Sequence, residues 1–441
     1  MGSLVVDKGR LGALQDWVWE SGFGANETCP LINSTFQSFP HCHQGRIPVY
    51  SALVESSAQI QEAVRFARAH NLHLVVRNTG HDGAGRSSGP DSFQIHTHRL
   101  KGITENSMPE GIATVLSWLG ESVLRSGLPG DSFWEEESPS ERFPIPPAFI
   151  EKLSVRGARS DVEFWRLGAT TQLEALRDLN REGIVGQFEL KHLAERGSME
   201  VSLEVYNLNT TDISSNRMNV LRVALERSGL HPTFLSRSVS KLTSALRHRG
   251  DIYPDDYGIL MGSVIVSNTL FNSSRGPQRI ADRLSQFPMA IGDTIFTSNL
   301  GGRVTDSQGL IDTSMHPAWR SSSQLFNFVR YLPYKSVEGK ITAMDDLTQV
   351  QMPILYALDP SIRASYLNLP DPNQKDAPQV YWGKNYGQLL RIKRQWDPDD
   401  LFVVRSGVGS ENWDVEGLCK QGMSVLARFQ TFLDALAWHF R

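Results

Sequence analysis

The segment Val75–Gly89 reads VVRNTGHDGAGRSSG and runs from an apolar, strand-like stretch into a glycine-rich loop. Glycine permits positive φ angles and lets a ligand come close to the backbone, so consecutive N–H groups can converge on an anion. Thr79, Ser87 and Ser88 add hydroxyl donors, and Arg86 adds positive charge. The loop therefore predicts an anion-binding site that contains one imidazole, that of His81. A tight connection between two strands, with a merely structural histidine, remains an open alternative.

Two common phosphate-binding motifs are excluded by the context of this loop. A dinucleotide-binding fingerprint has the spacing GxGxxG and opens a helix, whereas this loop leads into an alternating strand with Phe93, Ile95 and Thr97. A P-loop needs Gly-Lys followed by Ser or Thr, and the segment lacks that sequence.

The residues before the loop predict a small α/β unit. Pro48–Val54 has the composition of a strand, and Ser56 with Gln59 fits a capping box at the start of a helix. Apolar residues then recur at helical spacing before a second strand over Leu72–Val76. The members of that helical stripe are Ile60, Ala63, Val64 and Ala67.

A second informative segment lies near the other end of the chain, where residues 381–386 read YWGKNY. An amphipathic helical pattern follows, and it stops at Asp397-Pro398 because a residue before proline disfavours the helical conformation. Taken alone, this segment indicates ordinary packing of a helix.

The glycine loop and the YWGKNY segment, in this order, resemble the fungal berberine bridge enzyme-like FAD-linked oxidoreductases of the vanillyl-alcohol oxidase superfamily. The resemblance covers residues 48–102 and 162–419. It implies an α+β fold with a PCMH-type FAD-binding domain and a substrate domain, which is an antiparallel sheet backed by helices.

The resemblance also implies a set of cofactor-binding residues. His81 would bond covalently to the isoalloxazine ring, and Asn385 and Tyr386 would approach that ring. The pyrophosphate of FAD would be held by the glycine loop. No catalytic base is nominated. The loop residues expected at the cofactor are Asn78, Thr79, Gly80, Asp82, Gly83 and Ser87.

The middle of the chain fits the expected substrate domain. Residues 199–205 alternate as one strand, and helical patterns cover 216–227 and 280–287. Gly301–Val304 and His316–Arg320 resemble local patterns of the family, but a turn and a proline-directed loop are preferred there over direct catalysis. Further strands are expected over Gly258–Val266, Thr294–Leu300 and Leu325–Tyr331.

The chain departs from the family between Gly102 and about residue 160. No cysteine occurs between Cys42 and Cys419 to form a second flavin bond, and no Gly-Gly pair occurs between Gly102 and Gly197. At about 3.3 Å per strand residue and with connections of about 4 to 6 residues, the segment is too short for a second α/β subdomain. Most of that subdomain is therefore expected to be absent, whether through a damaged gene, an imperfect gene model or a degenerate paralogue.

These observations give five expected regions. They are an N-terminal extension (1–45), a truncated FAD-binding domain (46–160), a substrate domain (161–370), a C-terminal return to the FAD-binding domain (371–419) and an amphipathic tail (420–441).

The expected function is oxidation of a small organic substrate with dioxygen as electron acceptor, in fungal secondary metabolism that includes alkaloid pathways. The alternative is a flavin-free remnant that at most binds a small molecule. A monomer is expected. The net charge of −4 gives no reason to expect nucleic acid, and no apolar run is long enough for a membrane span.

The sequence leaves the cellular compartment of the protein undecided. Residues 1–12 carry no hydrophobic signal core, although relatives are often secreted, and N-glycosylation sequons begin at Asn26, Asn33, Asn209 and Asn272. Cys29 and Cys42 are spaced for a small disulfide loop, with Cys419 unpaired, and a reduced set is an equal alternative. No metal is assigned, because no further ligands complete a site at His41-Cys42-His43 or at His96 and His98.

Overall fold

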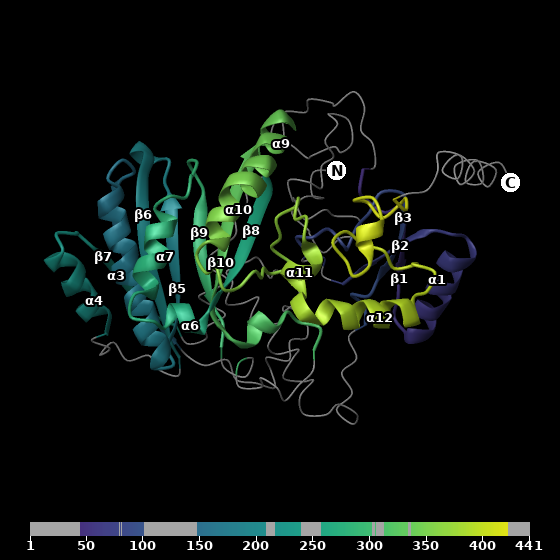
Figure 1. Cartoon of the computed structure of the whole chain (residues 1–441), viewed down its shortest axis with the longest axis horizontal. Helices are drawn as coiled ribbons and strands as arrows, with labels where there is room; N and C mark the ends of the chain where they lie inside the picture. The colour runs from purple at the N-terminus through teal and green to yellow at the C-terminus, as the bar shows by residue number, and fades with distance from the viewer. Residues whose placement is uncertain are drawn as a thin grey trace. The chain divides into compact units, whose positions relative to one another are not determined.

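The computed structural model describes residues 45–78, 80, 82–100, 148–208, 217–239, 257–301, 305, 313–333 and 337–421. The chain divides into two compact units (Figure 1). Within the described residues, 45–100 and 384–421 form the first unit, and 148–383 form the second. The first unit is therefore built from two segments that are far apart in the sequence.

A three-stranded parallel sheet forms the centre of the first unit. Its strands are β1 (Tyr50–Leu53), β2 (His73–Arg77) and β3 (Ser92–His96), in the order β1-β3-β2, and α1 (Ser57–Ala69) connects the first two. The predicted N-cap is confirmed, because the Ser56 side chain accepts a hydrogen bond from the Gln59 N–H at 3.3 Å, while the Gln59 side chain accepts from the N–H of Glu55 rather than that of Ser56. The small core contains Val54, Ala63, Ala67, Leu74 and Ile95.

The second segment of the first unit is anchored by Asp397. Helix α12 (Tyr386–Trp396) ends at this residue, as predicted. The Asp397 carboxylate accepts hydrogen bonds from the N–H groups of Leu401 and Phe402, at 2.8 and 2.9 Å. Leu401 packs against the core of the parallel sheet, so the turn after α12 is tied to that sheet.

The second unit contains a seven-stranded antiparallel sheet in the order β7-β4-β6-β5-β9-β10-β8. All of the strands that the sequence predicted in this region are confirmed. The strands are β4 (Ala148–Ala158), β5 (Val185–His192), β6 (Ser198–Leu208), β7 (Thr233–Val239), β8 (Tyr257–Ser267), β9 (Thr294–Asn299) and β10 (Ser322–Pro333).

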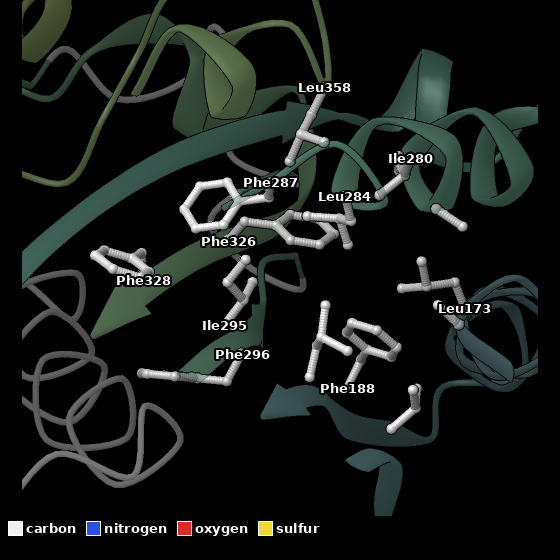
Figure 2. Packing of buried hydrophobic residues seen from close by; sticks show 14 of the residues in the cluster. Leu173, Phe188, Ile280, Leu284, Phe287, Ile295, Phe296, Phe326, Phe328 and Leu358 are labelled. Atoms are coloured by element: carbon white, nitrogen blue, oxygen red, sulfur yellow. The ribbon is translucent and has the colours of Figure 1, made fainter. Parts of the chain in front are cut away.

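Helices cover one face of this sheet (Figure 1). The long helix α3 (Val162–Arg181) packs on β4, β5 and β6, and α7 (Gly276–Leu284) packs beside it. Between helices and sheet, Leu173 and Leu284 meet the fully buried aromatic rings of Phe188 and Phe326 (Figure 2). The remaining helices are α4 (Arg217–Arg227), α6 (Asn268–Phe271), α9 (Val337–Asp346), α10 (Met352–Tyr356) and α11 (Ala377–Tyr381).

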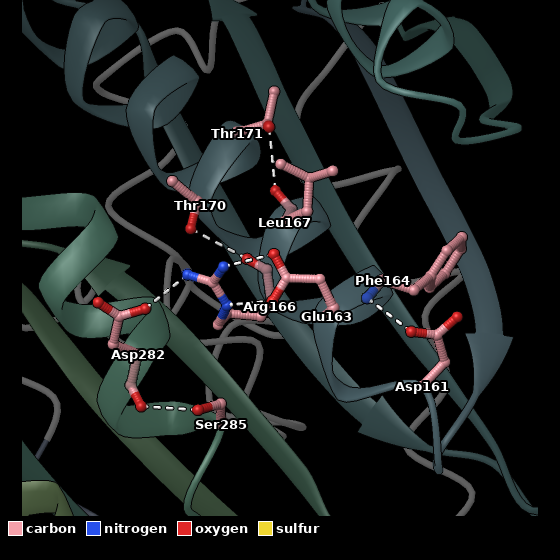
Figure 3. A network of polar contacts seen from close by, with 9 residues as sticks. All are labelled: Asp161, Glu163, Phe164, Arg166, Leu167, Thr170, Thr171, Asp282 and Ser285. Atoms are coloured by element: carbon pink, nitrogen blue, oxygen red, sulfur yellow. Dashed lines mark hydrogen bonds and ion pairs between the residues drawn. The ribbon is translucent and has the colours of Figure 1, made fainter.

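Polar contacts fix the start of α3 and join it to α7 (Figure 3). The Asp161 side chain caps α3 by accepting a hydrogen bond from the Phe164 N–H at 3.0 Å. Arg166 pairs with Glu163 at 2.5 Å and with Asp282 of α7 at 2.7 Å. Both carboxylates are exposed, so these ion pairs contribute little free energy and mainly set the register of the two helices.

The boundary of the second unit differs from the one expected at residue 160. Strand β4 lies between β6 and β7 and pairs with β6 over residues 148–158 and with β7 over residues 148–154, so residues 148–158 belong to the seven-stranded sheet of the second unit. The other boundary also shifts, since α11 and Gly383 cluster with the second unit, and the return to the first unit begins at Lys384 rather than at residue 371.

Several predicted segments lie outside the described residues. They include the N-terminal extension, the segment 103–147 in which the loss of a subdomain is expected, residues 302–304 and the apolar stripe of the tail. Among the helices that the structure does describe, none combines the length and apolar character needed to cross a membrane.

Candidate cofactor site

The glycine loop begins where β2 ends and leads directly into β3. In open α/β sheets, ligands bind outside the carboxyl ends of the parallel strands, and this loop occupies that position on β2. Thr79 and His81 are outside the described residues, so their roles stay predictions. Gly80 and Asp82 through Gly85 are buried.

Asp82 organises the loop from inside. Its carboxylate accepts hydrogen bonds from the Arg86 N–H at 2.7 Å, from the Ala84 N–H at 3.3 Å and from the Ser87 hydroxyl at 3.2 Å. The Arg86 guanidinium pairs with it at 3.0 Å. Because both carboxylate oxygens are used within the loop, any contact of Asp82 with a diphosphate would run through its backbone. The Ser87 hydroxyl, expected at the cofactor, donates to Asp82 in this structure.

Gly80 lies against the buried guanidinium of Arg77. Its φ angle is +80°, and an added Cβ would lie 2.7 Å from Arg77 Nε. A residue with a side chain would therefore meet both an unfavourable backbone conformation and a filled space. The positive φ angle therefore favours glycine at position 80, and a side chain there would also require the Arg77 guanidinium to move.

The far limb of the loop, from Gly85 to Ser88, is held by Arg46 and Gln94. Neither residue was predicted from the sequence. Arg46 donates hydrogen bonds to the carbonyl groups of Gly85 and Ser88, at 3.1 and 3.0 Å. Gln94, fully buried in β3, donates to the Ser87 carbonyl at 2.8 Å. The sequence contained an indication for Gln94, since it is a polar residue between Phe93 and Ile95 in a predicted strand. Arg46 had no local signal.

Asn78 and His96 connect the beginning of the loop to β3. His96 Nε2 lies 3.1 Å from the Asn78 carbonyl oxygen. Because a carbonyl can only accept, Nε2 carries the proton. Burial and the nearby Arg77 charge lower the pKa of His96, which favours the neutral ring. The rings of His96 and His98 are stacked with centroids 5.9 Å apart, so this pair has a packing role.

Asn385 and Tyr386 lie at the start of α12, in the same unit as the glycine loop. The Tyr386 hydroxyl donates to the Glu411 carboxylate at 2.5 Å and accepts from the Gly409 N–H at 3.1 Å. Burial, and then the hydrogen bond to Glu411, raise the pKa of Tyr386 to about 12. Tyr386 therefore fastens α12 to the loop that follows it, and its approach to a flavin ring stays a prediction.

The His316–Arg320 segment is a short 3₁₀ helix, η4 (Pro317–Arg320), with His316 at its N-cap. His316 Nδ1 accepts the Ala318 N–H at 3.0 Å, and the ring packs on Gly383. This agrees with a structural, proline-directed turn. In the described part of the chain, no three His, Cys, Asp or Glu side chains are grouped so that they could hold a metal ion.

The described loop fits a diphosphate group. Its buried backbone around Gly80, Gly83 and Gly85 carries no bulky side chains, and the Asp82 carboxylate is satisfied by Arg86 rather than facing a ligand. Positive φ angles at Gly80 and Gly85 curve the loop. The N–H groups of Ala84, Gly85 and Arg86 are hydrogen-bonded to Asp82, so an external anion would be held by the part of the loop before them.

The fold is similar to that of VAO-type flavoproteins. The VAO-type flavoprotein MtVAO713 of Myceliophthora thermophila is similar over 93% of this chain and 89% of its own, with a TM-score of 0.66 and 16% identity. Berberine bridge enzyme from Eschscholzia californica is similar over 81% of this chain and 89% of its own, with a TM-score of 0.51 and 12% identity. At such low identity, these similarities establish the fold alone.

Sequence similarity then establishes the family. The FAD-linked oxidoreductase easE of Arthroderma otae is 39% identical over 97% of this chain and 83% of its own length. The FAD-linked oxidoreductase penH of Penicillium thymicola is 38% identical over 93% of this chain and 84% of its own. The chain belongs to this family of FAD-linked oxidoreductases. Family models also match, for an FAD binding domain at residues 48–117 and for berberine and berberine like proteins at residues 365–409.

The alignment with the A. otae protein also bears on the expected loss of a subdomain. It runs over 512 positions, more than the 441 residues of this chain. The relative therefore has internal residues without a counterpart here.

Proposed function

We propose that this chain carries FAD bonded covalently through His81 and oxidises a small organic molecule. The observation that supports this most directly is the organisation of the loop around His81. Asp82 fixes the backbone that follows His81, and Arg77 supports Gly80 just before it. The described residues on either side of position 81 are thus held in place, as attachment of a cofactor there would require.

Bound FAD would supply the two-electron acceptor, and the protein would supply binding and orientation. The backbone of residues 78–83 would hold the diphosphate, as the fit of the buried glycine backbone indicates. Asn385 and Tyr386 would lie toward the ring. The Tyr386 hydroxyl is bonded to Glu411, and its pKa is raised to about 12, so it would stay protonated at neutral pH and could orient a ligand but not act as a base.

We further propose dioxygen as the final electron acceptor and fungal secondary metabolism, including alkaloid pathways, as the setting. Each substrate molecule oxidised would then yield one hydrogen peroxide. These two points rest on the resemblance to berberine bridge enzyme-like proteins.

The test is whether flavin stays with the denatured protein. The purified chain should be yellow, and its flavin should remain on the polypeptide in a denaturing gel. The His81→Ala variant should lose the covalent flavin, while His70→Ala, which changes an exposed histidine at the end of α1, should keep it. Covalent flavin in His81→Ala would refute the attachment site.

The second candidate is a flavin-free remnant, favoured by the positions that relatives have and this chain lacks. Its signature is a folded, colourless protein that takes up no FAD on incubation with the free cofactor. This outcome would replace the oxidoreductase proposal.

A further inference from the structure

The glycine loop is held from outside by two buried side chains, Gln94 of β3 and Arg46. Arg46 has a side chain that is only 8% exposed, and its guanidinium donates to two carbonyl groups of the loop, those of Gly85 and Ser88. Hydrogen bonds from a charged donor are stronger than neutral ones. Arg46 therefore holds, from outside, the limb of the loop that Asp82 supports from inside.

The same guanidinium forms an ion pair with Glu416, which lies far away in the sequence. A buried guanidinium needs a partner charge, because removing it from water is costly. Glu416 provides that charge and at the same time selects the orientation in which Arg46 faces the loop.

Glu416 is presented by a small hairpin formed by residues 412–421. The hairpin is closed by the Trp413–Lys420 bridge and by the Gln421 N–H, which donates to the Asn412 carbonyl at 2.7 Å. At its tip, the Asp414 carboxylate accepts from the N–H groups of Glu416 and Leu418, at 3.1 and 2.9 Å. The hairpin lies beyond residue 409, where the match to the berberine-like family model ends.

A second connection ties this hairpin to the same sheet. Gly417 packs on Val403, where an added Cβ would lie 3.2 Å from Val403 Cγ1. The His73 ring of β2 lies beside the Val403 backbone, and its Nδ1 lies 3.2 Å from the Pro90 carbonyl at the end of the loop. The hairpin is therefore held in place independently of Arg46.

We infer that Arg46 is a positioning residue for the cofactor loop and that the C-terminal hairpin, through Glu416, holds Arg46 in its working orientation. That the loop receives FAD rests on the proposed function. The role of Arg46 in ordering the loop does not, since it follows from hydrogen bonds within the described residues.

The test measures backbone hydrogen exchange in peptides covering residues 82–90, together with flavin content. In Arg46→Met, the loss of two charge-assisted hydrogen bonds should speed exchange of this loop on the order of tenfold or more. Flavin content should fall by more than about half, on the same reasoning. Arg46→Lys, which keeps the charge but loses the forked geometry, should lie between Arg46→Met and the unsubstituted chain.

Two comparisons separate this role from general destabilisation. Arg68→Met removes another ion pair between the two segments of the first unit, that of Arg68 with Asp399 at 2.5 Å, but does not touch the loop. It should leave loop exchange and flavin content unchanged. Exchange in β10 of the second unit should be the same in all variants.

A third comparison separates Arg46 from the flavin itself. Exchange is also measured in His81→Ala after removal of free FAD, with and without Arg46→Met, so that the loop is compared in the absence of cofactor. Faster loop exchange in both backgrounds supports the inference, and it does so even if the unsubstituted chain proves to be flavin-free, which would refute only the proposed function.

Glu416→Gln serves as the second variant in case Arg46→Met does not fold. It removes the partner charge but keeps the shape of the side chain, so it should speed loop exchange in the same direction and by a smaller factor. Unchanged exchange of residues 82–90 in Arg46→Met, or in Glu416→Gln where only that variant folds, would overturn the positioning role.

Discussion

At the scale of single residues, the cofactor loop depends on side chains that face inward. Asp82 is the clearest case, because its carboxylate accepts hydrogen bonds from Ala84, Arg86 and Ser87, while the expected place of this residue at the pyrophosphate stays a prediction. An anion near a phosphate would be unfavourable unless it were neutralised, and the Arg86 guanidinium neutralises it. The carboxylate is therefore the internal support of the loop.

Gly80→Ala tests the loop at this scale, with Gly183→Ala as the matched control. Both glycines have φ near +80°, but an added Cβ meets Arg77 at Gly80 and nothing within 4 Å at Gly183. The left-handed conformation costs a non-glycine residue about 1 to 2 kcal/mol, so both variants should lose about that much stability in urea unfolding. Only Gly80→Ala should lose more than this, together with its flavin. Equal flavin content in the two variants would contradict a cofactor role for the loop.

At the scale of elements, α12 is held by its ends rather than by a buried face. None of its residues is buried in the structure. Tyr386 at the start is bonded to Glu411 and Gly409, and Asp397 at the end is bonded to Leu401 and Phe402. Burial acts to raise the pKa of Asp397, but the hydrogen bonds from Lys393 and from the two N–H groups outweigh it and lower the pKa.

The Tyr386 contact predicts a pH dependence in the alkaline range. Its pKa is raised from 10.0 to about 12 in the folded protein. A raised pKa means that the stabilisation is fully present below the unfolded pKa and is lost as the pH rises through the folded value, so stability should decline between about pH 10 and pH 12. Tyr386→Phe should be less stable at pH 8 and should show a smaller decline in this range. The measurement is urea unfolding at a series of pH values, and an unchanged decline in Tyr386→Phe would show that another group is responsible.

At the scale of the whole molecule, the open question is how much of the flavin environment remains. Relatives have internal residues that this chain lacks, and residues 103–196 contain no Gly-Gly pair of the kind expected beside the isoalloxazine. The antiparallel unit is nonetheless complete enough to bury a large core across seven strands. The second unit thus has a large core, and a reduced wall of the cofactor site stays a prediction.

The absence of these internal residues predicts a flavin that is unusually exposed to solvent. Iodide should quench the flavin fluorescence of this protein more strongly than that of the A. otae relative, because fewer protein groups would shield the ring. Peroxide production should be correspondingly slow. Strong protection from iodide together with rapid, substrate-dependent peroxide release would show that other residues of this chain rebuild the wall.

The sequence by itself determined the parallel βαβ segment, the position of the glycine loop and the end of α12 at Asp397. These features depend on local patterns, namely apolar periodicity, capping residues and proline. It also determined the main strands of the antiparallel sheet, because residues such as Val201, Leu203 and Val205 alternate with polar neighbours.

Only the tertiary structure decided where β4 belongs and what holds the loop. Glu151 interrupts the apolar alternation of β4, and its burial is tolerable because Asn207 of β6 donates a hydrogen bond to it at 3.0 Å, a partner that no local pattern reveals. The partners of Arg46 and Glu416 are likewise not revealed by any local pattern. Each is an ordinary charged residue in the sequence, and each acquires its role only when folding brings the two segments of the first unit together.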